Sequence, residues 1–153
     1  MKTNYNIAEI PFPKTVGEID SGKLHQLLKE KLKGYVWFIS TTPKIYLVDR
    51  KYQLVTKEDM VKFLEDDKTD LEQYIADYHD CDDFAWALLG AMNVGSWSGI
   101  AFGFAFSRNH AFNVFTDGKD VYIIEPQRDY IWKVSEIPQK YKKFFLPVVL
   151  VMM

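Results

Sequence analysis

The final third of this 153-residue chain alternates short apolar segments with turn residues, and this pattern restricts the possible folds most strongly. Aromatic and β-branched residues are typical of buried strands. They fill five segments here: 100–106, 110–116, 121–125, 130–134 and 146–152. The earlier part of the chain is mostly helical in pattern. Helices followed by strands predict an α+β fold with an antiparallel sheet.

Helices are predicted to begin at Ser21, Thr56 and Asp80, because each of these side chains can cap a helix and an apolar stripe follows each one. Gly34 is a suitable end for the first helix. Helical spacing also relates Leu71, Tyr74, Ile75 and Tyr78. Three strand-like segments lie between the helices, namely 35–41, 45–48 and 52–55. We expect the last two to form a hairpin.

The length and composition predict a single folded domain over residues 1–153. Hydrophobic residues make up 48% of the chain and aromatic residues 16%, which is too apolar for a disordered protein. The formal net charge is −2, so the chain as a whole does not attract nucleic acid or anionic membranes. We therefore expect neither as a partner.

The sequence indicates a protein that is cytoplasmic where it is synthesised. A single cysteine cannot form an internal disulfide, so an oxidising compartment is not required. Residues 1–9 contain no apolar run of the kind found in a signal peptide. Residues 144–153 are apolar but include Pro147, and a membrane-spanning helix needs about 20 residues. We therefore expect no signal peptide and no transmembrane segment.

Cys81 is a candidate nucleophile because it directly follows the predicted helix cap, Asp80. Asp83 lies where a carboxylate can return a hydrogen bond to the cap. Free backbone N–H groups and the helix dipole at such a position stabilise a thiolate and can hold an oxyanion. The alternative is a small buried apolar residue. The charges of Asp80, Asp82 and Asp83 also disfavour a thiolate, so a positive group must lie nearby.

A hairpin in the last third brings a histidine close to an acid. Asp117-Gly118 is typical of a two-residue turn, and counting back from this turn places His110 opposite Glu125. A four-residue loop over 117–120 would place Gln127 opposite His110 instead. Either side chain could orient the imidazole ring.

Together these residues suggest a triad. Cys81 would be the nucleophile, His110 the base and Glu125 the group that orients the base. This arrangement predicts acyl transfer through a thioester. His79 is a competing base, but its position two residues before the thiol suits this role poorly.

Three short motifs carry a family resemblance: Cys81-Asp82-Asp83-Phe84-Ala85, His110-Ala111-Phe112-Asn113 and Ile124-Glu125-Pro126-Gln127. Their order resembles the papain-like and transglutaminase-like cysteine proteases, most closely the protease domain of the fairy-ring mushroom agglutinin. The resemblance covers about residues 78–127. It implies a papain-like fold in which N-terminal helices pack on an antiparallel sheet.

The activity implied by this resemblance is hydrolysis of peptide or amide bonds in a protein or peptide substrate, by Cys81, His110 and Glu125. A transglutaminase-like amide exchange is an open alternative. The resemblance also implies calcium or manganese near the site. Asp82 and Gln127 are the first ligand candidates, and Asp83 is a further one. A cation there would offset the aspartate charges.

A rival prediction is a non-catalytic binding or effector protein that retains the same fold. Aromatic residues at 97, 102, 104 and 106 would suit a binding surface, although packing in the core explains them better.

Overall fold

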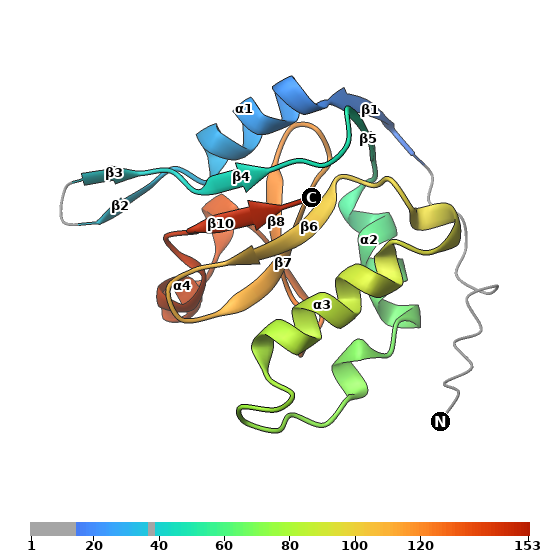
Figure 1. The fold of residues 1–153 in the computed structure, drawn as a ribbon, viewed down its shortest axis with the longest axis vertical. Helices are drawn as coiled ribbons and strands as arrows, with labels where there is room; N and C mark the ends of the chain where they lie inside the picture. The colour runs from blue at the N-terminus through green and yellow to red at the C-terminus, as the bar shows by residue number, and fades with distance from the viewer. Residues whose placement is uncertain (1–14, 37–38) are drawn as a thin grey trace.

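The computed structural model describes residues 15–36 and 39–153 (Figure 1). A six-stranded sheet of order β4-β10-β6-β7-β8-β9 forms the centre of this described part. Its strands are β4 (Lys44–Tyr46), β6 (Phe102–Phe106), β7 (Ala111–Thr116), β8 (Val121–Glu125), β9 (Tyr130–Lys133) and β10 (Leu150–Met152). Neighbouring strands are antiparallel, except that β10 and β4 are parallel.

Two smaller ladders come from the N-terminal part. Strand β1 (Gly17–Asp20) pairs with β5 (Lys51–Leu54), and β2 (Gly34–Val36) pairs with β3 (Ile39–Thr41). The segment 35–41, predicted as one strand, therefore belongs to a hairpin, and its residues 37–38 lie outside the described residues. The predicted hairpin of 45–48 with 52–55 was wrong, because β4 pairs with β10 and β5 with β1.

Four α-helices accompany the sheet in the described residues: α1 (Ser21–Lys31), α2 (Lys57–Asp66), α3 (Cys81–Met92) and α4 (Gln139–Phe145). Short 3₁₀ turns are η2 (Thr69–Leu71), η3 (Gly95–Trp97) and η4 (Val134–Glu136). The predicted cap Thr56 is confirmed, since its hydroxyl accepts from the Asp59 N–H at 3.1 Å. Helix α1 is capped by Asp20, one residue before the predicted cap Ser21. No described helix has the length and apolar character needed to cross a lipid bilayer.

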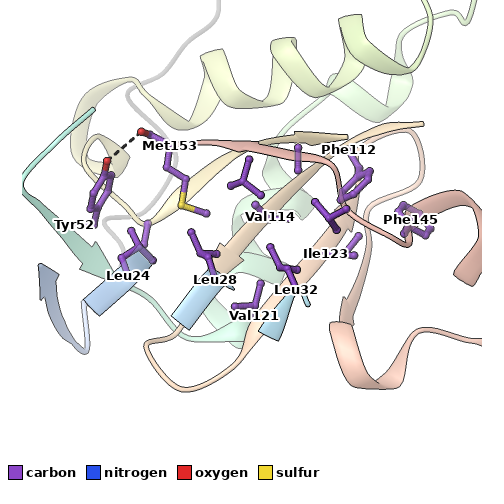
Figure 2. Close-up of a cluster of buried hydrophobic side chains, with 14 of the residues drawn as sticks. Leu24, Leu28, Leu32, Tyr52, Phe112, Val114, Val121, Ile123, Phe145 and Met153 are labelled. Carbon is purple, nitrogen blue, oxygen red and sulfur yellow. Dashed lines mark hydrogen bonds between the residues drawn. The ribbon is translucent and has the colours of Figure 1, made fainter. Parts of the chain in front are cut away.

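One face of the sheet packs against α1. Side chains alternate along a strand, so Phe112 and Val114 of β7 point to the same face. There they meet Leu24, Leu28 and Leu32 of α1, as Figure 2 shows. Tyr52 closes the end of this cluster, where its hydroxyl donates to the Met153 carbonyl at 3.1 Å (Figure 2).

The other face packs against α2 and α3. Phe115 of β7 and Ile124 of β8 belong to this second cluster. The helices contribute Met60, Phe63, Leu64, Leu88 and Met92. Each strand in the middle of the sheet is therefore covered on both sides, which explains why β7 is buried along its whole length.

The predicted papain-like arrangement, with N-terminal helices packed on an antiparallel sheet, was wrong. Helices cover both faces of the sheet, and β4 makes the sheet mixed because it runs parallel to β10 (Figure 1). The strands β7 and β8 are apolar on both faces and therefore need a cover on each.

The segment between α2 and α3 also differs from its predicted helix. After η2 it forms a tight turn, in which the Ile75 N–H donates to the His79 carbonyl at 2.9 Å and the His79 N–H donates to the Ile75 carbonyl at 2.7 Å. Asp77 within this turn has a positive φ of 64°. Its apolar side chains have no core to pack against, so helical spacing alone does not produce a helix here.

Candidate functional site

Cys81 is the first residue of α3, as predicted. The backbone N–H of Asp80 donates to Asp83 Oδ2 at 3.0 Å, which confirms the carboxylate predicted to cap this helix start. Cys81 packs against a small buried cluster formed by Ala85 of α3, Phe104 of β6 and Ala111 of β7. The thiol therefore lies between the helix start and the sheet.

His110 stands directly before β7 and contacts two of the predicted site residues. Its Nε2 lies 2.6 Å from Glu125 Oε2, and both side chains are largely buried. The Cys81 side chain is the second one that acts on the His110 ring. Burial alone would lower the pKa of His110, but the hydrogen bonds and negative charges of Cys81 and Glu125 raise this pKa to about 9. The structure thus brings the three residues together, with His110 as the positive group that the thiol requires.

Aromatic packing holds the His110 ring in place. Phe145 of α4 meets the ring edge to face, with 5.3 Å between the ring centres. The competing histidine, His79, lies elsewhere: its Nε2 is 2.7 Å from Glu72 Oε2, and its ring packs on Phe84. His110, and not His79, is therefore the histidine that lies beside the thiol.

The hairpin that carries this pair has the wider of the two predicted turns. Thr116 pairs with Val121, so the loop is 117–120 and the two-residue turn was wrong. Asp117 Oδ1 accepts from the N–H groups of Lys119 and Asp120, at 2.9 and 2.8 Å, and these bonds stabilise the wider loop. This register brings Gln127 towards His110, yet it is the Glu125 carboxylate that contacts the imidazole ring. The Gln127 N–H instead donates to Glu125 Oε1 at 3.3 Å.

The aspartates around the thiol interact with each other. A hydrogen bond shared between Asp80 and Asp82 lowers the pKa of Asp80 and raises that of Asp82. Possible ligand atoms of Asp80, Cys81 and Asp82 lie within 4.8 Å of one another. Oxygen donors suit calcium or manganese, so Asp80 and Asp82 fit a cation. Asp83 suits this role less well, because its carboxylate caps the helix.

A hollow of about 380 Å³ opens beside His110. Trp86 of α3 stacks on Phe104 there, with ring centres 4.2 Å apart and planes 10° from parallel, and 45% of the Trp86 side chain stays exposed. The whole lining consists of Asp82, Trp86, Phe104, Phe106, Ser107, Arg108, His110, Ala111 and Met152. The hollow thus combines an aromatic surface with charged groups.

Sequence reasoning identified this surface only in part. Of the four aromatic residues considered for a binding surface, Trp97 and Phe102 are buried in the second cluster, as core packing predicts. Phe106 and Phe104 do line the hollow. Trp86 and Arg108 were missed. A signal existed for Trp86, because it lies four residues after Asp82 and so shares a helix face with it.

Comparison with protein-family models and with curated proteins finds no match. Two solved structures share the fold. One is described as a PSL1a–E64 complex, with a TM-score of 0.69 and 18% identity over 89% of this chain and 51% of that chain. The other is Polyporus squamosus lectin bound to the human-type influenza-binding epitope Neu5Acα2-6Galβ1-4GlcNAc, with a TM-score of 0.66 and 17% identity over 89% of this chain and 49% of that chain.

These comparisons correct the predicted family. One of the two structures is described as a lectin, and neither is described as a papain-like or transglutaminase-like cysteine protease, so by this comparison the assignment to the relatives of the fairy-ring mushroom agglutinin was wrong. The motifs around Cys81, His110 and Glu125 specify a local arrangement of side chains, and such an arrangement does not fix a family. This chain spans about half the length of each matching structure.

The predicted function changes with the family. The terms hydrolase, cysteine protease and catalytic triad rested on the resemblance, and so did peptide or amide hydrolysis and amide exchange. Neither matching structure is described as an enzyme of these kinds, so by this comparison these predictions were wrong.

Proposed function

We propose that this chain is a binding protein that holds a carbohydrate in the hollow beside His110. The observation that carries the proposal is the exposed ring of Trp86, stacked on Phe104 and facing the charged side chains of Asp82 and Arg108. A flat aromatic surface can pack against the apolar face of a sugar ring, while a few polar groups fix its orientation.

The matching structures support this ligand class. One of them is described as a lectin bound to a sialylated epitope, and that description belongs to a protein about twice as long. A sialylated glycan carries a carboxylate. Arg108 at the rim of the hollow offers the guanidinium group that suits such a carboxylate.

Calorimetric titration with Neu5Acα2-6Galβ1-4GlcNAc, beside the same glycan without its sialic acid, tests the proposal. We expect Trp86→Ala to weaken binding of both glycans by about tenfold or more, because the stacking surface is lost. Arg108→Gln should weaken binding of the sialylated glycan alone. Arg50→Gln, which changes an arginine outside the hollow, is the matched control. Absence of saturable binding by the wild-type protein would overturn the proposal, as would equal binding by Trp86→Ala.

We propose a second role for Cys81, His110 and Glu125, which is to form a reactive thiol site next to the hollow. The hydrogen bonds from His110 to Cys81 and Glu125 favour this role, because an imidazolium stabilises a thiolate beside it. The proposal concerns the reactivity of the thiol and includes no acyl transfer.

Alkylation of Cys81 by iodoacetamide, followed by mass spectrometry from pH 5 to pH 10, tests this role. We expect alkylation to persist at acidic pH in the wild-type protein and to need a higher pH in His110→Ala. E64, the compound named with one matching structure, is the second probe, and its binding should weaken in Cys81→Ser. Identical pH profiles for the wild-type protein and His110→Ala would rule out the reactive thiol.

A further inference from the structure

The segment from the end of η2 to the start of α3 exposes several large apolar side chains. Leu71 is 72% exposed and Tyr78 is 85% exposed. Tyr74 and Ile75 are also exposed. Neighbouring apolar side chains on a protein surface often mark an interaction site. We call residues 71–78 the tyrosine loop.

The surroundings of the tyrosine loop are strongly acidic. Residues 65–83 include Glu65, Asp66, Asp67, Asp70, Glu72, Asp77, Asp80, Asp82 and Asp83. Lys68 is the only lysine or arginine in this range. A partner surface for this loop should therefore be apolar at its centre and basic around it.

The region around α4 has the opposite charge. Lys140, Lys142 and Lys143 lie on this helix, and residues 137–153 contain no aspartate or glutamate. Phe144 and Val149 are exposed beside the lysines. We call residues 139–149 the α4 patch. It has the apolar and basic character that the tyrosine loop requires of a partner.

We propose that the tyrosine loop of one copy of this chain docks on the α4 patch of a second copy. Both surfaces combine exposed apolar side chains with charge, and the two charges are of opposite sign. Figure 1 shows the segment before α3 and the helix α4 at separate positions on the outside of the fold. A two-fold dimer would use each contact twice, which helps it reach the roughly 1,600 Å² that stable interfaces bury. Neither surface contributes a residue to the lining of the hollow.

Charge reversal tests this pairing by sedimentation velocity over about 5 to 200 µM protein, a range suited to an interface of modest size. One variant carries Asp70→Lys, Glu72→Lys and Gln73→Lys, which change the formal charge of residues 70–78 from −3 to +2. The other carries Lys140→Glu and Lys143→Glu, which change the formal charge of the α4 patch from +3 to −1. We expect each variant alone to be monomeric, because its two surfaces then have the same sign. An equal mixture should dimerise, since each loop then meets an oppositely charged patch.

Apolar variants test the centre of the contact. Tyr78→Ser and Phe144→Ser should each weaken dimerisation by about tenfold. Val48→Ser is the matched control, because Val48 is 82% exposed and lies outside both surfaces. Circular dichroism confirms that each variant is folded. A wild-type protein that stays monomeric at every concentration would overturn the proposal, and so would a mixture of the folded charge variants that fails to associate.

Discussion

His110 Nε2 lies 2.6 Å from Glu125 Oε2, although the hairpin does not place these two residues opposite each other. The ladder pairs Asn113 with Ile124, so Glu125 lies diagonally across from His110. Diagonal neighbours on one face of a sheet remain within reach of long side chains. The diagonal contact occupies Nε2 and leaves Nδ1 as the ring nitrogen not bound to Glu125. The ion pair therefore forms although His110 and Glu125 are not directly opposite each other in the ladder.

The first prediction concerns the pH dependence of stability. The folded pKa of His110, about 9, lies above the ordinary value of 6.5, so the folded state binds the proton more tightly. The stabilisation from charged His110 is fully present below pH 6.5 and is lost as the pH rises through about 9. We expect the free energy of unfolding in urea to fall by up to roughly 3 kcal/mol over this window.

Two variants identify the source of that fall. His110→Gln should flatten the pH dependence, since glutamine does not titrate. Cys81→Ser keeps the contact between His110 and Glu125 and shows what the thiol contributes. A pH dependence in His110→Gln as steep as in the wild-type protein would contradict the prediction.

The second prediction concerns Asp129. Burial and the nearby charges of Asp70 and Asp67 raise the pKa of Asp129 to about 7. Because an acid with a raised pKa is destabilising once it is charged, Asp129→Asn should stabilise the protein above pH 7. We expect a gain of about 1 to 2 kcal/mol, less than the full pKa shift would give, because solvent screens this half-exposed side chain. Asparagine also tolerates the positive φ of 53° at this position. Thermal unfolding at pH 8 and pH 5 measures the gain, which should be present at pH 8 and much smaller at pH 5.

The third prediction compares two glycines. A Cβ at Gly103 would collide with the backbone carbonyl of Met152, so Gly103→Ala must disturb the pairing of β6 with β10. We expect a loss of at least about 3 kcal/mol. A Cβ at Gly90 meets no atom within 4 Å, and this residue lies inside α3. Gly90→Ala should therefore stabilise the protein by about 0.5 to 1 kcal/mol. Urea denaturation of both variants measures these opposite effects.

The fourth prediction concerns a cation at the start of α3, where the structure adds Asp80 to the sequence candidate Asp82. Calcium or manganese should bind at Asp80 and Asp82, because a cation would relieve the interaction between their carboxylates. Calorimetric titration should show binding by the wild-type protein and a loss of about tenfold or more in affinity in Asp82→Asn. Asp66→Asn, at the exposed end of α2, is the control. No uptake of either ion would remove the metal site.

The local features of the site could be predicted from the sequence because they depend on near neighbours. A cap at Asp80 followed by a thiol fixes the start of α3, and the contact between His110 and Glu125 follows from one hairpin. The length of the hairpin loop was less certain, since side-chain bonds from Asp117 favour the wider loop over the common two-residue turn.

The remaining architecture depends on contacts between distant residues. Local pattern does not show that β4 pairs with β10, or that β5 pairs with β1 instead of with β4. The hollow is a similar case. Trp86 comes from α3 and Arg108 from the loop before β7, so only the packing of the helix on the sheet brings them together. In the tyrosine loop the local pattern predicted too much. Its apolar residues recur at helical spacing, but they have no core surface to pack against, so no helix forms.

The position of β10 has a consequence for the order of folding. This strand lies between β4 and β6, so in the described part of the chain residues 44–46 join the main sheet only through residues 150–152. Contacts between residues so distant in sequence carry a large loop-closure cost and slow folding. On a ribosome, β4 would therefore stay unpaired until residues 150–152 have been made, and the antiparallel strands β6 to β9 would be complete before it is paired.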